Sequence, residues 1–127
     1  MRNKHVFYPG QLVQLRSGSS TMTVNQIDPA SNYVSCVWFD YEKSPELNEK
    51  RLAACVLEPL KVQTFSPNQS AETLQEGDVV KLRSGGPLIT IQAIRKDDAV
   101  CIWFDMALRE IMPCSGNIHL NALFIED

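Results

Sequence analysis

Cys114 and His119 come closest, among the 127 residues of the sequence, to a nucleophile with a nearby general base. They are five residues apart in a segment where Pro113 and Gly116 predict a loop, and the first half of the chain has no counterpart of either. The sequence also contains no glycine-rich phosphate loop, histidine metalloprotease motif or serine elbow. We therefore predict that the protein is not an enzyme.

The cysteines do not predict a metal site. Cys36 and Cys101 are flanked by valine or isoleucine at matching places in two predicted strands, which favours small buried apolar side chains. Cys55 and Cys114 do not match each other, and no two cysteines have the close spacing of a zinc ribbon. We expect no metal and no cofactor.

Two turns could bind an anion or the carboxylate of a partner protein. Each places a cation beside a hydroxyl and the amides of a tight turn, in Arg16-Ser17-Gly18 and again in Arg83-Ser84-Gly85. Lys81 shares a predicted face with Arg83 and adds charge to the second turn. The alternative is a solvated hairpin whose arginine pairs with a local carboxylate.

Two aromatic pairs are the other candidate binding residues: Trp38 with Phe39, and Trp103 with Phe104, each followed by an aspartate. Adjacent residues of a strand point to opposite faces, so one ring of each pair fills a core and the other points outward. The outward ring either packs between two parts of the chain or anchors a partner protein.

These motifs recur because the chain contains an internal repeat. Residues 10–40 correspond to residues 77–105, with an offset of 67 at Gly10/Gly77, 65 at Trp38/Trp103 and 66 at Leu57/Leu123. The repeat predicts a first module over 1–60, a linker over 61–75 and a second module over 76–127. Modules this small are marginally stable alone, so we expect them to pack together.

Each module is predicted to form short strands joined by tight turns. Alternating apolar residues predict strands on both sides of the Arg-Ser-Gly turns, and a break in the alternation before Ile27 and Ile94 predicts a bulge. The strand from Val34 to Phe39 is apolar on both faces, so its outer face must meet a loop, the other module or a partner. A further short edge strand is expected through Val6 to Tyr8. The fold class is therefore all-β, with two tandem SH3-like, partly open barrels packed with pseudo-two-fold symmetry.

Charge argues against a nucleic-acid backbone as the main ligand. The net charge is −3, with seven basic against six acidic residues in 1–64 and five against nine in 65–127. The N-terminal residues lack the apolar core of a signal peptide, and eighteen apolar residues never run together. We expect a soluble cytoplasmic protein with reduced thiols and no membrane association.

The run from Gly77 to Pro87, followed by Thr90-Ile91 and by Cys101 to Asp105, resembles the YodC-like family of small bacterial proteins. The first module is similar but carries Ser19-Ser20 in place of Gly-Pro. The family is uncharacterised and occurs in bacterial and prophage genomes, so the resemblance implies a small β fold without implying an activity. A tandem pair departs from the usual single module.

The leading expectation is a protein-binding or adaptor module, with a phage- or prophage-encoded inhibitor of a host or defence protein as its narrower form. The alternative is a β-barrel that binds single-stranded nucleic acid by stacking bases on aromatic side chains beside basic residues. A weaker option is a small-ligand pocket between the modules. The sequence leaves the oligomeric state open. The candidate binding residues are Arg16, Ser17, Trp38, Phe39, Lys81, Arg83, Ser84, Trp103 and Phe104.

Overall fold

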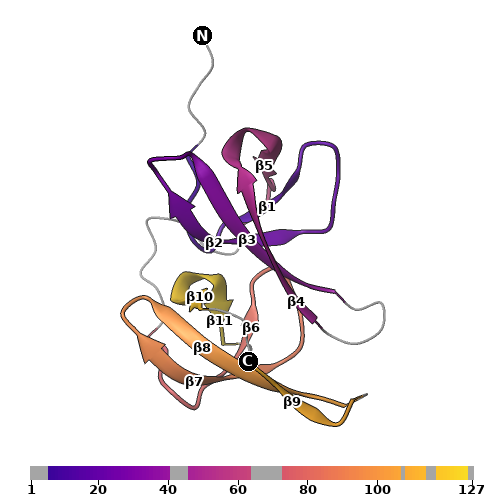
Figure 1. Ribbon diagram of the computed structural model, residues 1–127, viewed down its shortest axis with the longest axis vertical. Coiled ribbons are helices and arrows are strands. Elements are labelled where there is room, and N and C mark those ends of the chain that lie inside the picture. The colour runs from indigo at the N-terminus through magenta and orange to yellow at the C-terminus, as the bar shows by residue number, and fades with distance from the viewer. Residues whose placement is uncertain (1–5, 41–45, 64–72, 107, 114–116, 126–127) are drawn as a thin grey trace.

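A computed structural model describes residues 6–40, 46–63, 73–106, 108–113 and 117–125 (Figure 1). We call residues 6–63 the first half and residues 73–125 the second half. The first half contains β1 (Leu12–Leu15), β2 (Met22–Asp28), β3 (Tyr33–Asp40), β4 (Glu46–Ala53), the 3₁₀ helix η1 (Ala54–Val56) and β5 (Leu57–Pro59). The second half contains β6 (Val79–Leu82), β7 (Ile89–Arg95), β8 (Asp98–Asp105), β9 (Glu110–Pro113), β10 (Ile118–His119), the 3₁₀ helix η2 (Leu120–Ala122) and β11 (Leu123–Phe124).

Each half forms one antiparallel sheet in which the last strand returns to pair with the first. The strand order is β4-β3-β2-β1-β5 in the first half and β10-β8-β7-β6-β11 in the second, where β9 also pairs with β8. β9 and β10 pair with successive parts of β8 and together take the place that β4 has beside β3. The prediction of an all-β fold built from two partly open barrels is confirmed.

The two sheets share their turns in detail. Gly10 and Gly77 have φ values of 95° and 94° and donate to the carbonyls of Val24 and Ile91. These two bonds tie the turn before the first strand of each half to the second strand of the same half. Only glycine adopts such positive φ values without strain, which explains why it stands at both positions.

The predicted bulges are present in both halves. The register of β2 against β3 shifts between Val24 and Gln26, and that of β7 against β8 shifts between Ile91 and Ala93. The shifts bend each second strand, so that its two ends cover different parts of one small core. The edge strand predicted through Val6 to Tyr8 is wrong, because these residues lie outside the sheets and Phe7 packs into the first core instead.

Two apolar cores form, and the second contains residues from the first half. The first core gathers Phe7, Val13, Met22, Val24, Val34, Cys36, Ala54 and Leu57. The second gathers Leu74, Val80, Leu82, Ile89, Ile91, Ala99, Cys101, Trp103, Ile118, Ala122 and Leu123, together with Val37 and Phe39 of β3. The outer face of β3 is thus buried against the second half. The sequence predicted that this face would meet a loop, the other module or a partner, and the structure shows the second of these.

The halves stack head to tail, which differs from the predicted pseudo-two-fold pairing. Figure 1 shows β3 and β4 lying toward the second half, while β8 and β9 lie at the far end of the molecule. Phe39 packs against Trp103, yet the reciprocal contact of Phe104 with Trp38 is not made, because Phe104 is 53% exposed. The two halves therefore meet through different surfaces.

The polar contacts at this junction are also asymmetric, because they join β2 of the first half to a turn and to the β10 region of the second half. The amide of Ser84 donates to Thr23 Oγ1 over 2.8 Å, in the turn between β6 and β7. The buried Asn25 donates through Nδ2 to the Asn117 carbonyl (2.9 Å) and accepts at Oδ1 from the His119 amide (2.6 Å). Asn25 is the bulge residue of β2, so the bulge points its amide group into the second half.

Burial of Cys36 and Cys101 leads to a first expected result. At about pH 8 a thiol reagent should label Cys55 in the native protein and leave Cys36 and Cys101 unlabelled. Cys55 is exposed, whereas burial raises the pKa of the Cys36 thiol from 9.0 to about 12. Peptide mapping by mass spectrometry identifies the labelled residues.

The control is the same labelling in denaturant, where the protection of Cys36 should disappear. Folding raises the pKa of Cys36 from 9.0 to about 12. The contribution of Cys36 to the free energy of unfolding is therefore fully present below pH 9.0 and is lost as the pH rises toward about 12. Rapid native labelling of Cys36 would contradict its place in the core.

Candidate protein-binding site

The outer faces of the two sheets are equivalent, but the residues that the structure describes cover only one of them. In the first half this face carries Thr23, Val37 and Phe39, of which Val37 and Phe39 belong to the second core. In the second half it carries five residues that the strand register places side by side, and we call these the second-half face: Val79, Thr90, Ile102, Phe104 and Ile111. Val79, Phe104 and Ile111 are 49%, 53% and 66% exposed.

The covered face shows how such a surface binds. The Phe39 ring meets the Trp103 ring edge to face, with centroids 5.2 Å apart and planes at 82°. It lies so close to Gly86 that a Cβ at this residue would sit 2.4 Å from Phe39 Cδ2. The surrounding second core includes Leu82 and Ile89. The second half therefore provides a socket for one aromatic ring, and Phe39 fills it.

The corresponding surface of the first half is an open pocket of about 540 Å³, which we call the first-half socket. The internal repeat pairs Trp38 with Trp103, Leu15 with Leu82 and Met22 with Ile89. It also pairs Ser19 with Gly86. The residues that line the first-half socket are Leu15, Ser19, Ser20, Met22, Trp38, Lys50 and Leu52.

The aromatic residues singled out from the sequence occupy four different environments. Trp38 lines the first-half socket, Phe39 is buried at the junction, Trp103 lies beneath it and Phe104 is exposed. The structure brings Phe39, Trp103 and Ser84 together at the junction. Trp38 and Phe104 lie apart, on the open ends of the first and second half.

The two arginines of the Arg-Ser-Gly turns bind the protein's own backbone. Arg16 Nε donates to the Cys55 carbonyl over 3.2 Å, and Arg83 Nε donates to the Asn121 carbonyl. The Arg83 guanidinium also lies 5.9 Å from the centre of the Phe124 ring. Each arginine therefore ties its turn to the 3₁₀ helix of its own half.

The hydroxyl and lysine residues of these turns are placed differently. Ser17 is exposed on its turn, and Ser84 is half-buried against the first half. Lys81 is half-buried on β6, where it pairs with Phe124 of β11. A ligand-binding role for Arg16, Ser17, Lys81, Arg83 and Ser84 stays a prediction.

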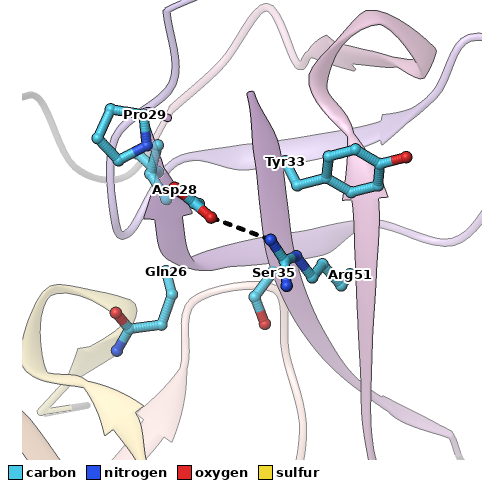
Figure 2. Close-up of a pocket in the computed structure, with 7 residues that line it drawn as sticks. Gln26, Asp28, Pro29, Tyr33, Ser35 and Arg51 are labelled. Atoms are coloured by element: carbon cyan, nitrogen blue, oxygen red, sulfur yellow. Dashed lines mark hydrogen bonds and ion pairs between the residues drawn. The ribbon is translucent and has the colours of Figure 1, made fainter. Parts of the chain in front are cut away.

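A second, more polar pocket of about 360 Å³ lies where β2, β3 and β4 come together (Figure 2). Arg51 crosses it, pairing with Asp28 at 3.0 Å and lying 5.3 Å from the centre of the Tyr33 ring. Hydrogen bonds from Ser31 and Ala30, aided by Arg51, hold the pKa of Asp28 below its ordinary value. Since Arg51 already has a carboxylate partner, an anionic ligand would have to displace Asp28.

The first-half socket is therefore the stronger candidate for binding a protein. Sequence reasoning identified Trp38 but missed the other lining residues, which are Leu15, Ser19, Ser20, Met22, Lys50 and Leu52. One signal was available in the repeat, where Ser19-Ser20 replaces Gly86-Pro87. The second copy has glycine at this position and the first copy has serine. This difference indicates that another group lies close to the turn in the second copy but not in the first.

Comparison with known proteins finds a match to part of the second half. Residues 75–111, which run from the start of the second half into β9, match a family described as an uncharacterized small protein (DUF2158). This match fits the resemblance to the YodC-like small proteins. No curated protein matches the chain. Over the described ranges, no helix has the length and apolar character needed to cross a membrane.

Proposed function

We propose that the protein is a non-enzymatic protein-binding module whose first-half socket receives an aromatic side chain of another protein. One observation carries the proposal: the equivalent socket of the second half already holds an aromatic side chain, Phe39, presented by a β-sheet. The ring is supplied by the first half of the same chain. The open socket repeats this arrangement on a surface that no described part of the chain covers.

The chemistry of the first-half socket suits such a ligand. Leu15, Met22 and Leu52 supply apolar walls, and Trp38 offers an indole ring for edge-to-face contact. Lys50 lies at the rim, where a partner carboxylate could pair with it. Protein interfaces commonly combine a central aromatic anchor with a polar rim of this kind.

The narrower form of the proposal concerns origin and partner. We take the two halves to be tandem copies of the family module matched by residues 75–111, because both sheets share strand order, bulge and turn hydrogen bonds. The prophage occurrence of the resembling family supports a role as a cytoplasmic inhibitor of a host or defence protein. The partner would then contribute the aromatic side chain.

Binding of single-stranded nucleic acid receives less support. Trp103 is only 6% exposed, so a base cannot stack on its ring while Phe39 is in place. Arg16 and Arg83 both use Nε on backbone carbonyls. The net charge of −3 adds to these objections.

The experiment is a selection of random peptides displayed on phage, performed on a Phe104→Ser chain so that the second-half face takes no part. Selected peptides should share an aromatic residue, because a ring can make with Trp38 the edge-to-face contact that Phe39 makes with Trp103. Ser20→Tyr should weaken their binding at least about tenfold in calorimetry, since the new ring fills the socket.

The matched control is Arg51→Ala, which alters the second pocket and should leave peptide affinity unchanged. Peptides that bind equally well to the Ser20→Tyr chain would overturn the assignment of the socket. Failure to enrich any saturable binder would argue against the whole proposal.

A further inference from the structure

We infer that the first-half socket binds the second-half face of another copy of this chain, with Phe104 as the inserted ring. The inference rests on the proposed function, because it names the protein that supplies the aromatic side chain. It follows from the head-to-tail contact, which leaves one socket and one face that the described parts of the chain do not cover.

The contact between the halves is heterologous, since a face of one half meets a socket of the other. Such a contact can repeat, because each added unit presents a new face and a new socket. In Figure 1 β8 and β9 lie in the lower part of the molecule, and the connection between β1 and β2, which carries Ser19 and Ser20 of the first-half socket, lies in the upper part. A second copy could therefore stack on the first in the same orientation.

The residues of the second-half face match those that make the internal contact. Phe104 corresponds to Phe39, and Ile102 corresponds to Val37. Thr90 corresponds to Thr23, whose Oγ1 accepts a hydrogen bond from Ser84. In a contact between copies Thr90 would meet the amide of Ser17, which is exposed.

The strand register extends the match to a fourth position. Leu47 pairs with Phe39 across β3 and β4, and Ile111 pairs with Phe104 across β8 and β9. Ile111 is 66% exposed, whereas Leu47 packs against the second core. Three exposed apolar side chains on one sheet face, Val79, Phe104 and Ile111, are typical of an interaction surface.

Two differences make the contact between copies weaker than the contact within the chain. Ser19 stands where the internal socket has Gly86, and a Cβ at Gly86 would lie 2.4 Å from the inserted ring. The incoming Phe104 ring must therefore sit farther from the turn. In addition, the halves of one chain are covalently linked, which raises their effective concentration, whereas separate copies are not.

Sedimentation equilibrium tests the inference over about 10 µM to 1 mM protein, the range suited to a weak contact. We expect concentration-dependent association of the native chain that Phe104→Ser and Ser20→Tyr each abolish. Ser19→Gly should tighten association about tenfold, because it removes the obstructing Cβ. Ser19→Ala is the matched control, since it removes the same hydroxyl but keeps the Cβ, and it should not tighten association.

Mixing two blocked chains tests the head-to-tail geometry. The Phe104→Ser chain retains only its socket, and the Ser20→Tyr chain retains only its face, so an equimolar mixture should form a one-to-one dimer and nothing larger. A Ser19→Gly chain that stays monomeric throughout the range would overturn the inference, as would association that survives Phe104→Ser. Aromatic peptides that bind the socket of such a monomeric chain would leave the proposed function standing and remove only the second copy as its partner.

Discussion

Phe39→Ala should lower the free energy of unfolding by about 3–5 kcal/mol, whereas Phe104→Ala should lower it by less than about 1 kcal/mol. The two phenylalanines occupy equivalent positions in β3 and β8, directly after a tryptophan. Phe39 is 8% exposed and packs on Trp103, while Phe104 is 53% exposed. Urea unfolding of the two variants measures the difference.

The comparison is well controlled because both substitutions remove the same atoms from the same strand position of equivalent sheets. Tryptophan fluorescence provides a second readout, since removing the Phe39 ring uncovers Trp103 and should increase its quenching by acrylamide. Equal losses of stability in the two variants would show that the head-to-tail packing of the halves is wrong.

Gly86→Ala is the second substitution with a large expected effect, and it should cost about 1–3 kcal/mol more than Gly85→Ala. Both glycines have positive φ, 145° at Gly86 and 105° at Gly85, so both alanine variants carry backbone strain. Only at Gly86 does the new Cβ collide with a ring, 2.4 Å from Phe39 Cδ2, and at Gly85 nothing lies within 4 Å. Thermal or urea unfolding gives the two values.

A double-mutant cycle separates the collision from the strain. In a Phe39→Ala background the ring is absent, so the extra cost of Gly86→Ala over Gly85→Ala should vanish. Persistence of the extra cost in that background would mean that Gly86 is constrained by something other than Phe39.

Local features of each half were predictable because they depend on residues close together in the sequence. The strand through Val80 and Leu82, the two tight Arg-Ser-Gly turns and the bulges before Ile27 and Ile94 all follow from such patterns. The two-sided apolar character of β3 also indicated correctly that its outer face would be covered.

The packing of one half on the other was not predictable in the same way. Phe39 and Phe104 have nearly identical neighbours in sequence, yet one is buried and the other exposed. What distinguishes their environments lies elsewhere in the chain: the second half provides Gly86 and Trp103 beside Phe39, whereas the described residues leave Phe104 uncovered. A repeated sequence suggested a symmetric pair, but a face can bind a socket without any symmetry between them.

Because Phe39 of the first half is part of the second core, we expect the two halves to fold in a fixed order during synthesis. The first half emerges from the ribosome first, and all of its core residues lie between Phe7 and Leu57, within the first half itself. The second core is incomplete without Val37 and Phe39, which the first half supplies. Domains that leave the ribosome early fold early. We therefore expect the first half to fold first and to expose the outer face of β3, against which the second half completes its core once Leu123 has been synthesised.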